Sequence, residues 1–138
     1  MIVVDTNIVA YFLIEGPRTP AVRHLRNCDP QWRLPSLWRH EFLNILATYT
    51  RQGGATFRQA IQIWKDAVRT FSPGEQVADL EHALLLATKQ KVSAYDAQFI
   101  SLAQALGVAC ITEDRKLQKS FPQIAISIQA FCATRDIP

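Results

Sequence analysis

Cysteine and histidine are scarce in this sequence. Its three cysteines, Cys28, Cys110 and Cys132, are an odd number without close pairing, which argues against a disulfide framework and against a zinc site. The three histidines share no metal-binding spacing, and none stands beside a candidate nucleophile. We therefore expect surface or partly buried roles for His24, His40 and His82.

Long apolar stretches are also lacking. No uninterrupted apolar run reaches the length of a membrane span. The apolar residues Ile2 to Val4 are followed at once by Asp5 and are not preceded by the basic segment of a signal peptide. Together with the few cysteines, these absences predict a protein of the reducing cytoplasm.

Charge is limited in amount and balance. Charged residues make up 20% of the chain, and 15 Lys and Arg against 12 Asp and Glu give a net charge of +3. This excess is compatible with a nucleic-acid partner but too small to establish one. The 49% hydrophobic content suffices for one sizeable core, so residues 1–138 are expected to form one folded domain.

The apolar pattern predicts strands alternating with helices. Short β-branched or apolar runs predict strands at 2–4, 32–34, 108–112 and 124–128, the last followed by a short tail. Helical spacing predicts helices near 8–13, 20–27, 38–49, 57–71, 76–90 and 94–106. Strands joined through helices pair in parallel. The expected class is α/β, a three-layer domain with a mostly parallel central sheet and helices on both faces.

Local signals also predict how the helices begin and which faces they bury. Thr19 before Pro20 resembles an N-cap, and Ser36 is placed to cap the helix that follows it. The apolar residues expected to pack are Phe57, Ile61, Trp64, Val68 and Phe71 in one helix and Leu80, Leu84 and Ala87 in the next.

Four acidic residues border apolar segments, where a fold usually avoids charge unless it is solvated, paired or bound to metal. Asp5 and Asp114 follow predicted strands, at the carboxyl edge where α/β sheets bind ligands. Glu41 borders a helix face that should be buried, and Asp96 lies in the first turn of another helix. These four side chains form the candidate catalytic and metal-binding site.

Each acid also has an ordinary structural explanation. Asp5 and Asp114 could cap the helical segments that follow them, and Glu113 could be solvated charge. Ser93 and Asp96 match the spacing of a capping box, in which the acid bonds back to the capping residue.

A converging group of carboxylates raises its own pKa values unless a cation is present, so the expected completion is Mg²⁺ or Mn²⁺. Such an ion orients or deprotonates a water for in-line attack on a phosphodiester. Thr6, Asn7 and Thr112 would add hydrogen bonds around the ligands, and Arg115 and Lys116 could contact substrate phosphates.

The motifs together resemble a PIN domain, and in particular the short VapC-type toxins of prokaryotic toxin-antitoxin pairs. The resemblance rests on Met1–Asn7, Pro35 followed by Glu41, Tyr95-Asp96-Ala97, and Leu106-Gly107 leading into Thr112-Glu113-Asp114. It places Asp5, Glu41, Asp96 and Asp114 at the acidic metal-site positions of the family and Thr112 at its hydroxyl position.

The resemblance implies a metal-dependent endoribonuclease that forms a homodimer and is neutralised by a small antitoxin occluding the active site. Two departures are visible. Leu117 stands where some relatives carry another acid, which bears on the number of metal ions. The run Trp38-Arg39-His40 replaces the small apolar residues common before Glu41, which bears on substrate preference.

Three other functions fit parts of the pattern. A non-catalytic PIN-like scaffold that binds RNA or protein would keep the fold, although all four acids are intact. A phosphotransfer receiver would need paired acids early and a lysine late at a strand end, and both are missing. A haloacid-dehalogenase-type phosphatase would need a second Asp where Asn7 stands.

Overall fold

A four-stranded parallel sheet forms the centre of the protein. The computed structural model describes residues 1–136 and orders the strands β2-β1-β3-β4. Their bounds are β1 (Ile2–Val4), β2 (Trp32–Arg33), β3 (Cys110–Ile111) and β4 (Ala125–Ile126). Val4 of β1 lies opposite Ile111 of β3. The residues that follow these two central strands, Asp5 and Thr112, therefore emerge side by side.

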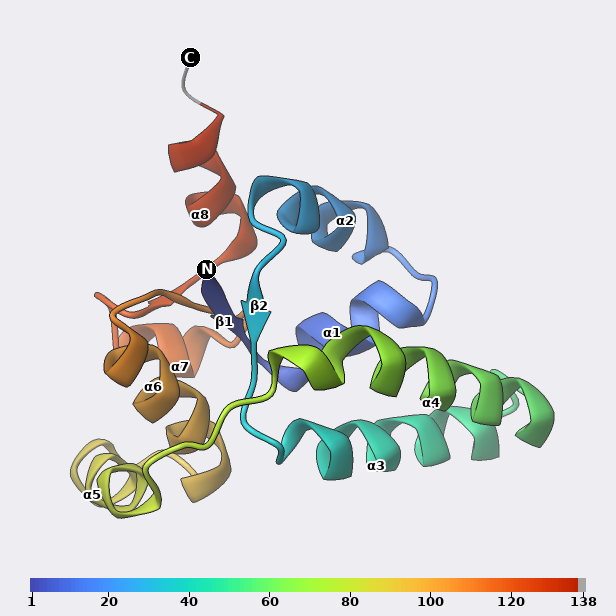
Figure 1. Cartoon of the computed structure of the whole chain (residues 1–138), viewed down its shortest axis with the longest axis horizontal. Coiled ribbons are helices and arrows are strands. Elements are labelled where there is room, and N and C mark those ends of the chain that lie inside the picture. The colour runs from blue at the N-terminus through green and yellow to red at the C-terminus, as the bar shows by residue number, and fades with distance from the viewer. Residues whose placement is uncertain (137–138) are drawn as a thin grey trace.

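Helices lie on both sides of this sheet (Figure 1). In that view α5, α6 and α7 lie on one side of β1 and β2, and α1, α3 and α4 lie on the other. The predicted α/β class with a parallel central sheet is confirmed. In residues 1–136, no helix has the length and apolar character needed to cross a membrane. The helices are α1 (Thr6–Leu13), α2 (Thr19–Cys28), α3 (Trp38–Arg51), α4 (Phe57–Phe71), α5 (Leu80–Gln90), α6 (Ala94–Leu106), α7 (Arg115–Ser120) and α8 (Ile128–Arg135), with a 3-10 turn at Ser72–Gly74.

An aromatic cluster joins α3 and α4 to the edge of the sheet. Trp32 of β2 stacks on Phe71 of α4 with ring centroids 5.6 Å apart, and Trp38 of α3 meets Phe71 edge-on at 6.0 Å. Phe42 stacks on Trp64 at 6.3 Å. Trp64 and Phe71 are therefore packing residues, as predicted, and they hold the helix that carries Glu41.

Two predicted helix faces are partly wrong. In α4 the buried residues are Ala60, Ala67 and Phe71, whereas Phe57 is 76% exposed and Ile61 38% exposed. In α5 the buried residues are Ala83 and Leu86, whereas Leu80 and Leu84 are exposed. The prediction chose the wrong face because both helices carry apolar residues on more than one face. The face that packs contains alanines, whose small side chains allow two helices to approach closely.

The predicted starts of three helices also need correction. Thr19 lies inside α2, and its buried hydroxyl donates to the carbonyl of Tyr11 at 2.7 Å, so it ties α2 to α1. Ser36 makes no cap, because α3 begins after Leu37 without a side-chain cap. Helix α5 begins at Leu80 after the N-cap Asp79, because Gln76 is drawn into an extended segment by a backbone bond to Leu34.

The end of the chain differs most from the expectation. The strand predicted at 124–128 is confirmed only for Ala125 and Ile126, and the strand predicted at 108–112 only for Cys110 and Ile111. Ile128 begins helix α8, where a tail was predicted. Ser127 caps this helix by accepting a bond from the Ala130 N–H at 3.0 Å. Helix α8 packs against α2.

Gly74 offers a test of the packing between the 3-10 turn and the sheet. A Cβ at this position would overlap the carbonyl oxygen of Trp32, whereas a Cβ at Gly16 would meet its nearest atom at 3.9 Å. We expect Gly74→Ala to lower the free energy of unfolding by about 1–3 kcal/mol, measured by urea denaturation. Gly16→Ala is the matched control. Equal stability of the two variants would show that the contact with Trp32 relaxes freely.

Candidate active site

One pocket at the carboxyl ends of β1 and β3 contains all four predicted acids. They come from four separate parts of the chain: the end of β1, the first turn of α3, the first turn of α6 and the start of α7. The structure therefore brings the four predicted acids together. The residues lining the pocket are Asp5, Thr6, Asn7, Glu41, Asn44, Ile45, Asp96, Phe99 and Asp114.

Asp5 is both a helix cap and a pocket residue. One carboxylate oxygen accepts a hydrogen bond from the Ile8 N–H at 3.1 Å, which caps α1. The other accepts from the hydroxyl of Thr112. The capping explanation is thus correct, but it uses one oxygen and leaves the carboxylate at the pocket.

Thr112 connects two of the acids. Its side chain is fully buried, and its hydroxyl donates to Asp5 while accepting a bond from the Asp114 N–H at 3.1 Å. Its carbonyl accepts from the Gln118 side chain at 2.8 Å. This hydroxyl therefore sets the direction of the Asp5 carboxylate and the path of the chain into Asp114.

The carboxylate of Asp114 caps a helix, whereas the carboxylate of Asp96 does not. Asp114 accepts from the N–H groups of Lys116 and Leu117 at 2.9 and 3.2 Å, as the N-cap of α7. At α6 the Ser93 hydroxyl accepts from the Asp96 N–H at 3.0 Å, but within residues 1–136 no bond returns from the Ser93 N–H to the Asp96 carboxylate. Only half of the predicted capping box forms, which leaves the Asp96 carboxylate directed at the pocket.

Glu41 is positioned by interactions at both ends of the first turn of α3. Its carboxylate accepts a hydrogen bond from the Thr6 hydroxyl at 2.6 Å. The indole N–H of buried Trp38 donates to Glu75 at 2.8 Å, and the same Glu75 oxygen accepts from Arg39. The unusual Trp38-Arg39 pair before Glu41 therefore anchors the start of the helix.

The pocket is electrostatically unfavourable for several carboxylates at once. The pKa of Asp5 is raised to about 6, mainly by burial and also by the charges of Asp96 and Glu41, against the hydrogen bonds from Thr112 and Ile8, which lower it. Burial and the charge of Asp96 raise the pKa of Glu41, and burial and the charge of Asp114 raise the pKa of Asp96. Among residues 1–136, no Lys or Arg lines the pocket to compensate these charges. A bound cation would remove this repulsion.

The donor chemistry of the pocket suits a hard divalent cation. All of its charged donors are carboxylate oxygens, and Thr6, Asn7 and Asn44 add neutral oxygens. Across residues 1–136, no three of the four carboxylates belong to a set whose ligand atoms all lie within 4.8 Å of one another. An ion contacting a subset of them would complete its shell with water, as Mg²⁺ usually does in proteins.

Of the other residues predicted for the site, some line the pocket and some lie beside it. Asn7 lines it, and Asn44, one helical turn after Glu41, was missed although its i,i+3 spacing on α3 gave the signal. Arg115 and Lys116 are exposed beside the lining, and the charge of Lys116 lowers the pKa of Asp96 against the larger effect of burial.

The neighbours of Asp114 have structural roles. Leu117 is buried in the core, so this position supplies a packing side chain and adds no metal ligand to the pocket. Glu113 accepts from the Ile128 N–H at 2.8 Å and pairs with Arg18 at 3.9 Å. Glu113 therefore contacts the start of α8 and Arg18, so it is not merely the solvated charge that it could have been from the sequence.

Comparisons with known proteins agree with this fold. The family model described as PIN domain matches residues 2–121, a span that includes all four acids. The chain is 26% identical to ribonuclease VapC3 of Pyrobaculum aerophilum over 129 residues, 89% of this chain and 96% of that protein. The crystal structure of PAE2754 from Pyrobaculum aerophilum superimposes with a TM-score of 0.75 over 97% of this chain and 95% of that chain. At 19% identity this last likeness shows the fold alone.

The raised pKa of Asp5 predicts a pH-dependent stability in metal-free protein. Burial moves this pKa from 3.8 to about 6 on folding, so the folded protein binds the proton more tightly than the unfolded chain. The contribution is complete below the unfolded pKa and is lost as pH rises through the folded pKa. We therefore expect the free energy of unfolding to fall between about pH 4 and about pH 7 and the decline to be smaller in Asp5→Asn. Urea denaturation with chelator at each pH measures both. An identical slope in the variant would assign the dependence to other groups.

Thr112→Val tests the link between Asp5 and Asp114. The substitution keeps the shape of the side chain but leaves Asp5 Oδ2 without its donor and the Asp114 N–H without its acceptor, while Asp5 Oδ1 keeps the bond from the Ile8 N–H. We expect the free energy of unfolding to fall by about 1–3 kcal/mol. Thr88→Val removes an exposed hydroxyl that bonds the Leu84 carbonyl, and should change stability by less than about 0.5 kcal/mol. Similar small losses in both would mean that the Thr112 bridge contributes little.

Proposed function

Because the chain belongs to the PIN domain family, we propose that it is a metal-dependent endoribonuclease with Asp5, Glu41, Asp96 and Asp114 as its catalytic residues. The observation that carries this proposal is the meeting of these four acids in one pocket. Capping explains two of them only in part and does not explain Glu41 or the carboxylate of Asp96. The name of the related ribonuclease VapC3 supports RNA as the substrate.

Mg²⁺ or Mn²⁺ fits the all-oxygen donors of the pocket and the raised pKa values of its acids. Asp5, Glu41, Asp96 and Asp114 would hold the ion. When bound, it would neutralise charge on the scissile phosphate and make a coordinated water more acidic. The metal requirement is part of the proposal.

The protein's own residues would prepare the site before substrate arrives. The hydroxyls of Thr6 and Thr112 hold Glu41 and Asp5 in single orientations, which reduces the reorganisation needed during the reaction. Phe99 and Ile45 form the apolar part of the wall and limit the water around the carboxylates.

Contacts with RNA would come from the exposed start of α7. Arg115 and Lys116 lie in its first turn, directly after Asp114, and the charge of Lys116 already reaches Asp96. Contacts of these cations with the RNA backbone would position the substrate without reading its sequence.

We further propose that the protein is the toxin of a toxin-antitoxin pair, acts in the cytoplasm, forms a homodimer and is blocked by a small antitoxin. The likeness to a VapC ribonuclease over most of both chains supports this assignment. An exposed apolar surface on α3 and α4 supports protein contacts: Leu43 is 51% exposed and Phe57 76% exposed, and both line a groove with Ile61 and Trp64. A short neighbouring gene for a DNA-binding antitoxin would favour this proposal.

Asp96→Asn separates catalysis from capping. The Asp96 N–H keeps its bond to Ser93 in the variant, so the fold should be preserved while a charge needed by the cation is lost. We expect cleavage of a mixed RNA pool with Mg²⁺ or Mn²⁺ to fall about 100-fold or more in the variant, and chelator to abolish it in the wild type.

Glu81→Gln is the matched control, because Glu81 lies in the first turn of α5 and does not line the pocket. Circular dichroism checks the fold of each variant. Binding of RNA without cleavage by metal-replete wild type would support the non-catalytic scaffold. Equal cleavage by wild type and Asp96→Asn would point to a different active site or a contaminant.

A further inference from the structure

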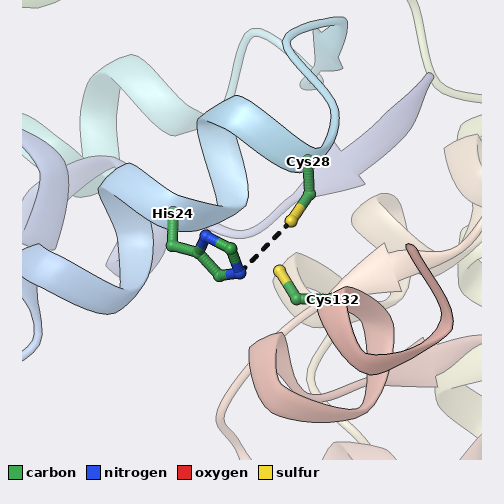
Figure 2. Close-up of side chains that lie close together, drawn as sticks. All are labelled: His24, Cys28 and Cys132. Atoms are coloured by element: carbon green, nitrogen blue, oxygen red, sulfur yellow. Dashed lines mark hydrogen bonds between the residues drawn. The ribbon is translucent and has the colours of Figure 1, made fainter. Parts of the chain in front are cut away.

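A second group of metal-ligating side chains lies away from the acidic pocket, between α2 and α8. His24 and Cys28 project from α2 toward Cys132 of α8 (Figure 2). Their ligand atoms all lie within 4.8 Å of one another, the one such set of three in residues 1–136. The sequence argued against a zinc site, because the spacing of the cysteines and histidines gives no sign of this cluster, which forms where α8 packs against α2.

Helical spacing places two ligands on each of the two helices. His24 and Cys28 are four residues apart and lie on the same face of α2. Cys132 and Asp136 are also four residues apart, at the last turn of α8 and the residue that ends it. The carboxylate of Asp136 reaches His24, with 3.3 Å between Oδ2 and Nε2. Asp136 is not part of the set of three whose ligand atoms all lie within 4.8 Å of one another, so it would have to move closer to the two thiols to become a fourth ligand.

The distances between ligand atoms in the structure agree with the edges of a zinc tetrahedron. With bonds of about 2.3 Å to sulfur and about 2.0–2.2 Å to nitrogen and oxygen, tetrahedral ligands lie about 3.6 Å apart for S and N and about 3.4 Å apart for N and O. The distance from Cys28 Sγ to His24 Nε2 is 3.6 Å, and that from His24 Nε2 to Asp136 Oδ2 is 3.3 Å. Two edges of the polyhedron are already close to their bound lengths.

The donor set also distinguishes this site from the acidic pocket. Two thiolates and an imidazole are soft or borderline ligands that select Zn²⁺ over Mg²⁺, whereas carboxylates alone select the hard ion. Cys132 is 3% exposed, while the side chains of His24 and Asp136 are about half exposed. An ion can therefore enter from solvent and become shielded on its thiol side.

We propose that His24, Cys28, Cys132 and Asp136 bind one Zn²⁺ ion, which fastens the C-terminal helix α8 to α2. Binding releases the two thiol protons to solvent, leaving both cysteines as thiolates. Four protein ligands make a closed site with a structural role. This site is independent of the nuclease activity and of the ion proposed for the acidic pocket.

Zinc retention by the reduced full-length protein tests the proposal. Protein incubated with Zn²⁺ and then passed through gel filtration in excess Mg²⁺ should keep one zinc per chain by elemental analysis. Co²⁺ in place of Zn²⁺ should give the thiolate charge-transfer and visible absorption bands of a tetrahedral sulfur site. Zinc should also raise the thermal midpoint of unfolding by several degrees, because it binds the folded state selectively.

Substitutions of the ligands locate the ion. His24→Asn changes a half-exposed side chain and should fold normally, while Cys132→Ser tests the buried ligand. Each should weaken zinc binding about 100-fold or more and remove the thermal shift, since even partners outside the ligand shell cost about 10–100-fold. His82→Asn and Cys110→Ala remove the same residue types elsewhere and should retain zinc, as should Asp96→Asn.

Two results would overturn the proposal. One is reduced wild-type protein that keeps no zinc, even if oxidation then joins Cys28 to Cys132 in a disulfide. The other is zinc that survives both His24→Asn and Cys132→Ser but is lost in Asp96→Asn, which would place the ion in the acidic pocket.

Discussion

The architecture of the acidic pocket depends on one hydroxyl group, that of Thr112, which donates to Asp5 on one side and accepts from the backbone N–H of Asp114 on the other. This bridge exists because β1 and β3 pair with Val4 opposite Ile111, so that the two strands end together. A slip of one residue would turn the following side chains to the opposite face of the sheet. Strand register, set by burial of the apolar residues of β1 and β3, therefore controls the chemistry at the sheet edge.

The pocket retains charges that the fold by itself opposes. Desolvation and mutual repulsion raise the pKa values of Asp5, Glu41 and Asp96, while hydrogen bonds from Thr112 and Thr6 act in the opposite direction on Asp5 and Glu41. These bonds orient the carboxylates but do not balance the burial. A bound cation would offset this cost, which would link the stability of the fold to the proposed ligand.

Sequence reasoning worked where the signal is local. A β-branched run ending in Asp5, the cap at Ser93 and the glycine with positive φ at Gly107 each mark an element through interactions within a few residues. It failed for α8 and for the buried face of α5. Ser127 gave a cap signal for α8, but the preceding apolar residues favoured a strand, and α5 buries Ala83 and Leu86 because of where α6 lies.

The sequence alone therefore determined the alternation of strands and helices, which follows from the periodicity of the apolar residues. It also determined which four acids meet in the pocket, because each of them lies beside an apolar segment. Tertiary structure decided which side chains meet. It added Asn44 to the pocket, turned Glu113 to α8, and brought His24 and Cys28 to Cys132 from the far end of the chain. The physical reason is that strand pairing and helix packing bring together residues whose distance along the chain carries no local signal of their contact.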